Sequence, residues 1–120
     1  MAWTRPPSEL VALFERLRPP TGAGVEHRSM FGYPCAFCGG NMFAGLHEAS
    51  LVLRLGPEDR EAFLALPGAR LFEPMPGRAM KEYVRVPEAL LADEPVLRGW
   101  MERSLACARA LPPKRARSKR

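Results

Sequence analysis

Two apolar runs in the middle of the chain dominate the pattern of hydrophobic positions. Residues 42–46 and 51–55 are almost entirely apolar, and they are separated by His47, Glu48, Ala49 and Ser50. Strands that are buried on both faces are typically apolar at consecutive positions, without alternation. The pattern therefore predicts a β-hairpin over residues 41–55 at the centre of a sheet, with helices covering at least one face.

Three other segments show the spacing of amphipathic helices. The first has Pro6 and Pro7 in its first turn and ends at Pro19 and Pro20. The second starts at Pro57, which is followed by acidic residues. The third starts after Asp93, a natural N-cap, and runs to about residue 111. The apolar stripes are Leu10, Leu13, Phe14 and Leu17 in the first helix, Ala62, Phe63 and Leu66 in the second, and Leu97, Met101, Leu105 and Ala108, supported by Trp100, in the third.

The remaining segments predict strands joined by turns. Strands are expected at residues 25–30, within 31–40, at 70–72 and at 80–86, and residues 87–91 form a short turn or the start of a helix. Residues 73–79 contain two prolines and a glycine, so they are expected to form a turn or loop. The predicted order is a helix, three or four strands, a helix, two strands and a helix, which is an α+β domain.

The net charge of +5 is concentrated at the end of the chain. Without the last seven residues, the chain carries 13 basic and 13 acidic side chains, so residues 1–113 are neutral. We divide the chain into an arm at 1–7, a domain at 8–111 and a basic tail at 112–120, which is expected to be disordered. The alternative is weak, non-specific binding of nucleic acid through the tail. Its candidate contacts are Lys114, Arg115, Arg117, Lys119 and Arg120.

The composition points to the cytoplasm and away from several classes of protein. The first residues lack the long apolar run of a signal peptide, and no stretch is long and apolar enough to cross a membrane. Three cysteines are an odd number, which argues against a secreted disulfide scaffold. Neither a nucleophile motif nor a phosphate-binding glycine loop is present, so we expect no enzymatic activity, catalytic residue or cofactor.

Cys35 and Cys38 are separated by two residues, a spacing that also occurs in metal and redox sites. A redox pair usually has a helix N-terminus after its first cysteine, whereas a glycine turn and a strand are expected here. Zinc would need further ligands, and only His27, His47 and Cys107 are candidates. We interpret the two cysteines as small, semi-buried residues and predict no metal, with a zinc or redox role as an alternative.

Residues 72–83 carry a second candidate site. Met75, Arg78, Met80 and Lys81 flank a Pro-Gly turn, and methionines and cations on an exposed loop could bind an anion or a partner protein. The alternative is a well-packed connection whose methionines cover the core. We predict these four residues as a candidate partner surface.

Several motifs together resemble the TfoX N-terminal domain family. They are SMFG at 29–32, NMFAGL at 41–46, LVLRL at 51–55 and FEPMPGRAMKEYV at 72–84, and the likeness extends over residues 8–111. The resemblance implies a two-layer α/β sandwich similar to secretion chaperones, with an antiparallel sheet and the order α-β(3)-α-β(2)-α. The family's named member regulates bacterial natural competence, is thought to act with the cyclic-AMP receptor protein, and carries a second helical domain, whereas here we expect only the basic tail after the first domain.

From these patterns we expect a bacterial, cytoplasmic, non-enzymatic domain that binds another protein or assists transcription. Its partner is not identified by the sequence. A homodimer stays open, because sheets of the secretion-chaperone type often pair, and Trp3 or Trp100 could serve such a contact if exposed.

Overall fold

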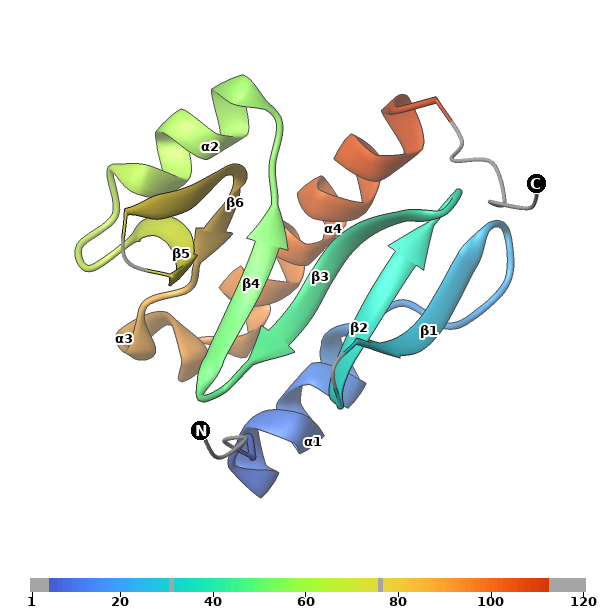
Figure 1. Ribbon diagram of the computed structural model, residues 1–120, viewed down its shortest axis with the longest axis horizontal. Coiled ribbons are helices and arrows are strands. Elements are labelled where there is room, and N and C mark those ends of the chain that lie inside the picture. The colour runs from blue at the N-terminus through green and yellow to red at the C-terminus, as the bar shows by residue number, and fades with distance from the viewer. Residues whose placement is uncertain (1–4, 31, 76, 113–120) are drawn as a thin grey trace.

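The computed structural model describes residues 5–30, 32–75 and 77–112, and it shows an α+β fold with one six-stranded antiparallel sheet (Figure 1). The sequence predicted three or four strands between the first two helices, and the structure has four. The elements are α1 Ser8–Leu17, β1 Val25–Met30, β2 Tyr33–Cys38, β3 Asn41–His47, β4 Ser50–Arg54, α2 Pro57–Leu64, β5 Arg70–Met75, β6 Arg78–Arg85, α3 Glu88–Leu91 and α4 Glu94–Ala110.

The strand order in the sheet is β1-β2-β3-β4-β6-β5, so the predicted hairpin β3–β4 lies at the centre. Four of the five residues of β4 are buried, as expected for a strand that is covered on both faces. The hairpin turn is shorter than predicted, because His47 pairs with Ser50 and only Glu48 and Ala49 connect the strands. Glu48 has a positive φ of 54°, which a two-residue hairpin turn requires.

Helices α1 and α4 lie together behind the sheet in Figure 1, and they bury the core against β2, β3 and β4. The predicted stripe of α1 is confirmed, since all four of its residues are buried. In α2 only Phe63 is buried, and Ala62 is exposed, so that part of the prediction was wrong. Trp100 is half-buried and packs edge-to-face on Phe63, with 4.9 Å between the ring centroids.

The predicted N-cap of α4 is confirmed, and one buried residue of this helix was missed. The Asp93 carboxylate accepts a hydrogen bond from the Val96 N–H at 3.4 Å. Ser104 is fully buried and lies where β3 and β4 separate, beyond the pair formed by Ala44 and Leu53. Its hydroxyl contacts the Phe43 and Arg54 carbonyls, and it accepts a bond from the Arg54 N–H at 3.2 Å. Ser104 thus joins α4 to both central strands.

The prediction of a loop over residues 73–79 was wrong. Strand β5 continues to Met75 and β6 begins at Arg78, so β5 is also longer than the predicted 70–72. Pro74 is tolerated because β5 is an edge strand, where a residue without an N–H does not interrupt a ladder on both sides. The pairing between β5 and β6 shifts at Phe72, and such bulges bend a strand.

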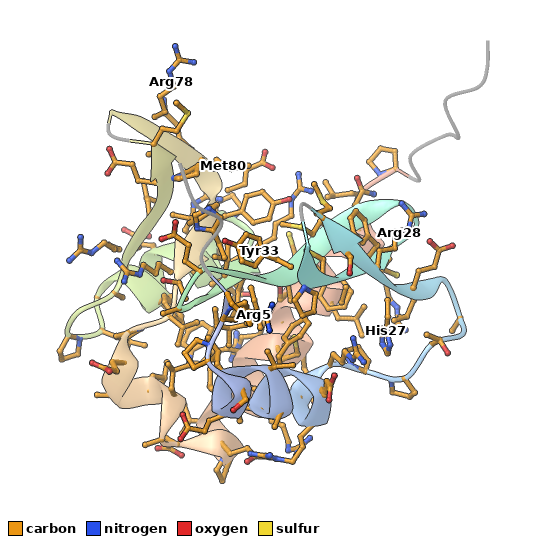
Figure 2. The ribbon with its side chains drawn as sticks, turned by 60° about the horizontal axis from the view of Figure 1, so that its bottom comes forward. Arg5, His27, Arg28, Tyr33, Arg78 and Met80 are labelled. Carbon is orange, nitrogen blue, oxygen red and sulfur yellow. The ribbon has the colours of Figure 1, made fainter. Side chains whose placement is uncertain are left out.

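As a result the β5–β6 hairpin rises from the sheet on the side opposite α1, with Arg78 at its far end (Figure 2). The helices therefore cover one face of the sheet, and the hairpin leans over the other. Within the described part of the chain, none of the helices combines the length and apolar character needed to cross a membrane.

Candidate functional site

An apolar groove of about 300 Å³ lies on the face of the sheet that the helices leave uncovered. We call this groove the trough. Its two sides come from segments far apart in the sequence: the β1–β2 end on one side and the β5–β6 hairpin on the other, with β3 and β4 between them. The trough is lined by Met30, Tyr33, Cys35, Met42, Gly45, Leu46, His47, Val52, Phe72, Pro74 and Met80.

Contacts between three rings hold the hairpin over the sheet. His47 on β3 lies between Tyr33 of β2 and Phe72 of β5, with centroid distances of 5.4 Å and 5.1 Å. The contact between His47 and Phe72 joins a central strand to the edge strand across the bend of the sheet. Tilted and edge-on ring contacts stabilise by roughly 0.5–1.5 kcal/mol each beyond area burial. All three rings line the trough.

The floor of the trough depends on one glycine. Gly45 pairs directly with Cys35, and a Cβ atom at position 45 would lie 2.9 Å from the Cys35 Sγ. The thiol therefore occupies the space that any other residue at position 45 would need. Val52 lies beside Gly45 on β4 and packs with Phe72 and Tyr83 in a small cluster separate from the main core.

Tyr83, a member of this cluster, bonds to the backbone of Met42, which lines the trough. The Tyr83 hydroxyl donates to the Met42 carbonyl at 3.1 Å, and the Arg54 guanidinium lies 3.4 Å from the same hydroxyl and forms an ion pair with Glu82. Burial raises the pKa of Tyr83, and the positive charge of Arg54 opposes that rise. The tyrosine hydroxyl therefore acts as a donor that holds β6 against β3.

The predicted partner surface lies on the β5–β6 hairpin, next to the trough. Met80 lines the trough, whereas Met75 lies outside the lining and is 60% exposed. Neither the Arg78 nor the Lys81 side chain forms an ion pair or hydrogen bond with any residue that the structure describes. The sequence singled out this one side of the trough and missed the strands that form the remainder.

The two cysteines of the predicted alternative site do not face each other. Cys35 lines the trough, whereas Cys38 belongs to the core on the helix side, since residues three apart on a strand point to opposite faces. Burial raises the pKa of the Cys35 thiol, which is the opposite of what a reactive redox thiol needs. His27, one of the further ligands considered for zinc, has its Nε2 atom 2.7 Å from the Pro19 carbonyl oxygen.

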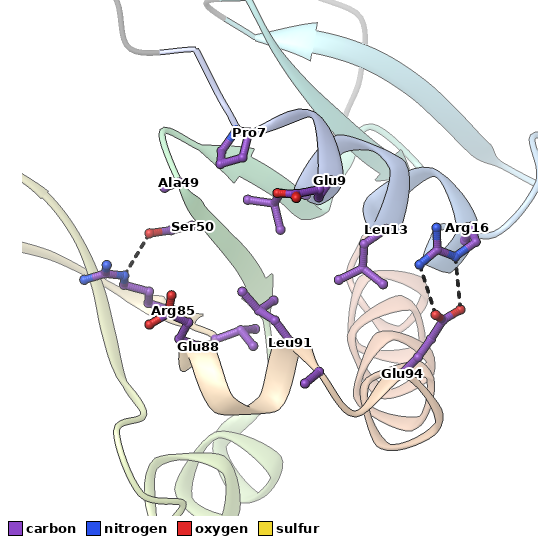
Figure 3. Close-up of a pocket in the computed structure, with 13 residues that line it drawn as sticks. Pro7, Glu9, Leu13, Arg16, Ala49, Ser50, Arg85, Glu88, Leu91 and Glu94 are labelled. Carbon is purple, nitrogen blue, oxygen red and sulfur yellow. Dashed lines mark hydrogen bonds and ion pairs between the residues drawn. The ribbon is translucent and has the colours of Figure 1, made fainter.

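A larger cavity of about 590 Å³ lies between α1, α3 and the β3–β4 turn (Figure 3). Both of its arginines already have partners: Arg85 Nε donates to the Ser50 hydroxyl at 2.8 Å, and Arg16 pairs with Glu94 at 3.2 Å. Arg16 is also the main reason that the pKa of Glu94 is lowered. Because the arginines are paired and the other acids of the lining, Glu9 and Glu88, are exposed to solvent, we regard the trough as the better candidate.

The predicted nucleic-acid contacts, residues 114–120, lie outside the described residues, as does Trp3. In the part of the chain that is described, no group of three or more histidines, cysteines and acidic residues lies together as metal ligands would. The buried side-chain nitrogen and oxygen atoms of these described residues all have hydrogen-bond partners.

Comparison with protein families supports the resemblance drawn from the motifs. A comparison with curated protein sequences finds no significant match. The family model for the TfoX N-terminal domain matches residues 15–108, which include all strands of the sheet and most of α4. This match covers well over half of the chain, and the fold agrees with it. The chain belongs to the TfoX N-terminal domain family.

Proposed function

We propose that this protein is a non-enzymatic interaction domain that binds a partner protein through the trough. The observation that carries the proposal is an apolar groove on the uncovered face of the sheet, bordered by exposed methionines. Met30 and Met80 are 39% and 41% exposed, although large apolar side chains are usually buried. Apolar grooves of this kind mark interaction sites.

Methionine suits such a surface because its unbranched, flexible side chain adapts to different partner groups. The scaffold below the trough is rigid, since β3 and β4 are central strands tied to α4 through Ser104. A stable floor with adaptable edges is the arrangement expected of a peptide-binding groove. The family's connection with competence regulation leads us to propose a bacterial, cytoplasmic protein whose partner belongs to the transcription apparatus.

The test is a pair of matched substitutions on the two faces of the molecule. Met80 lines the trough, whereas Val96 lies on α4 and is exposed to nearly the same extent, 44%. A photo-crosslinking amino acid placed at position 80 in the bacterial cell should capture a distinct protein that the same group at position 96 does not. The purified partner should then bind the wild-type chain and the Val96→Asp variant equally, and lose affinity for Met80→Asp.

Two results would contradict the proposal. One is the same set of crosslinked proteins from both positions, which would indicate non-specific capture. The other is a captured partner whose affinity is unchanged by Met80→Asp.

The basic tail supports a second candidate function, weak binding of nucleic acid. Residues 114–120 hold five positive charges and no acid, while the preceding residues are neutral. Contacts between such a tail and phosphates would give an affinity that falls steeply with salt. Binding of random duplex DNA should then disappear when the chain is cut after residue 113, and unchanged binding by the shortened chain would rule this candidate out.

A further inference from the structure

We propose that the segment bound in the trough is acidic: an apolar side chain enters the trough while neighbouring Asp or Glu side chains contact Arg78 and Lys81. This inference rests on the proposed function and adds the chemistry of the partner. It follows from how the charges around the trough are paired.

The acidic residues of β1, β5 and β6, the strands at the two sides of the trough, already have partners. Glu82 pairs with Arg54, Glu26 pairs with Arg28, and Glu73 accepts a hydrogen bond from the Gly77 N–H. Each of these contacts neutralises an acid or holds it within its own element. The acids are therefore not available to attract a basic partner.

The cations of the hairpin have no such partners. Arg78 and Lys81 are exposed on β6, on either side of Met80 in the sequence, and neither forms an ion pair among the described residues. Figure 2 shows Arg78 reaching away from the body of the protein at the far end of the hairpin. The charged side chains of these strands that have no partner are thus positive, and complementary charge selects an acidic partner and speeds its association.

Other occupants fit this charge less well. The chain's own tail brings five further positive charges, and a second copy would bring the same two cations to the same place. Either occupant would place positive charges next to Arg78 and Lys81 and would be repelled by them. Nucleic acid matches the charge, but Tyr33 and Phe72 of the trough are only 7% and 9% exposed, so they offer no open ring face on which a base could stack.

The experiment selects short random peptides displayed on phage against the full-length chain, followed by affinity measurements on synthetic copies of the selected peptides. We expect the selected sequences to share a large apolar residue flanked by Asp or Glu. The double variant Arg78→Glu/Lys81→Glu should weaken binding roughly tenfold, because two exposed attractive pairs become repulsive. Arg109→Glu, an exposed position on α4, serves as the matched control and should change little.

A charge exchange completes the test. Peptides in which Lys replaces the flanking acids should bind the double variant better than they bind the wild-type chain. The inference is overturned if no peptide is enriched, if the enriched peptides show no acidic bias, or if charge reversal leaves their affinity within about twofold. It is also overturned if random duplex DNA displaces the peptides and is itself lost on charge reversal.

The same peptides separate this inference from the proposed function. If Met80→Asp abolishes binding while charge reversal has no effect, the trough binds a peptide but the partner is not acidic. If Met80→Asp leaves binding unchanged, the proposed function itself fails.

Discussion

Replacing Gly45 with alanine should destabilise the protein, and the cost should depend on Cys35. The added methyl group would lie 2.9 Å from the Cys35 Sγ, a distance that forces either group to move. Overpacking of this kind costs about 1–3 kcal/mol, while replacing a strand glycine by alanine otherwise gains about 0.5–1 kcal/mol. We therefore expect Gly45→Ala to lower the free energy of unfolding by about 0.5–2 kcal/mol.

Removing the thiol should remove the cost. In a Cys35→Ala background the closest remaining atoms, the Cβ at position 35 and the Pro34 carbonyl oxygen, lie 3.5 Å away, which is an ordinary contact. There the Gly45→Ala change should be neutral or stabilising by up to about 1 kcal/mol. The coupling energy between the two positions is then about 1–3 kcal/mol.

Urea unfolding of the four proteins in reducing buffer measures this coupling. Gly99→Ala is the matched control, because its added methyl meets open space on α4 and should stabilise the helix by about 0.5–1 kcal/mol. If Gly45→Ala costs the same with and without the thiol, Cys35 does not occupy the floor as described, and the reasoning is refuted.

Three further predictions concern the framework around the trough. Ser104→Ala leaves the buried Arg54 N–H without its hydrogen-bond acceptor and should lower the free energy of unfolding in urea by about 2 kcal/mol. The control Ser29→Ala changes an exposed residue and should lower it by less than about 0.5 kcal/mol. Equal losses for the two variants would contradict the role of Ser104. Arg16 lowers the pKa of Glu94, so this pair stabilises the fold at pH values above the ordinary carboxylate pKa, and the stabilisation decreases as the pH falls. Arg16→Ala should therefore raise the pKa of Glu94 in an NMR titration. An unchanged pKa would refute the contact. Burial raises the pKa of Cys35, so at neutral pH its alkylation, followed by mass spectrometry, should be slower in the native than in the unfolded protein, and equal rates would exclude its burial.

The sequence was sufficient to predict the centre of the sheet and the helices beside it. An apolar run that does not alternate requires burial on both faces, and β4 is covered by α4 on one face and by Phe72 and Tyr83 of the hairpin on the other. The N-cap at Asp93 could be identified because a short acidic side chain precedes a proline and an amphipathic stripe. Ser104 shares the helical spacing of Leu97, Met101 and Ala108, so the spacing alone would have placed it on the buried face of α4. Its burial was not predicted because serine is polar.

The trough could not be predicted from local pattern. It forms because bulges in β5 and β6 bend the hairpin back until Phe72 reaches His47 on β3, and strand patterns carry no information on that bend. The prolines of the hairpin favoured a loop, and only the place of β5 at the edge of the sheet made a strand acceptable. The cysteines show the reverse: an odd spacing on a strand already separates Cys35 and Cys38 onto opposite faces.

The central claim is that the uncovered face of the sheet binds a partner segment, and methionine methyl NMR tests it most directly. In the full chain labelled with ¹³C at the methionine methyl groups, Met30, Met42 and Met80 report on the trough, and Met101 reports on the core beneath α4. Adding a selected peptide or the captured partner should shift the three trough signals and leave Met101 unchanged. Binding that leaves the three trough signals in place would contradict the claim.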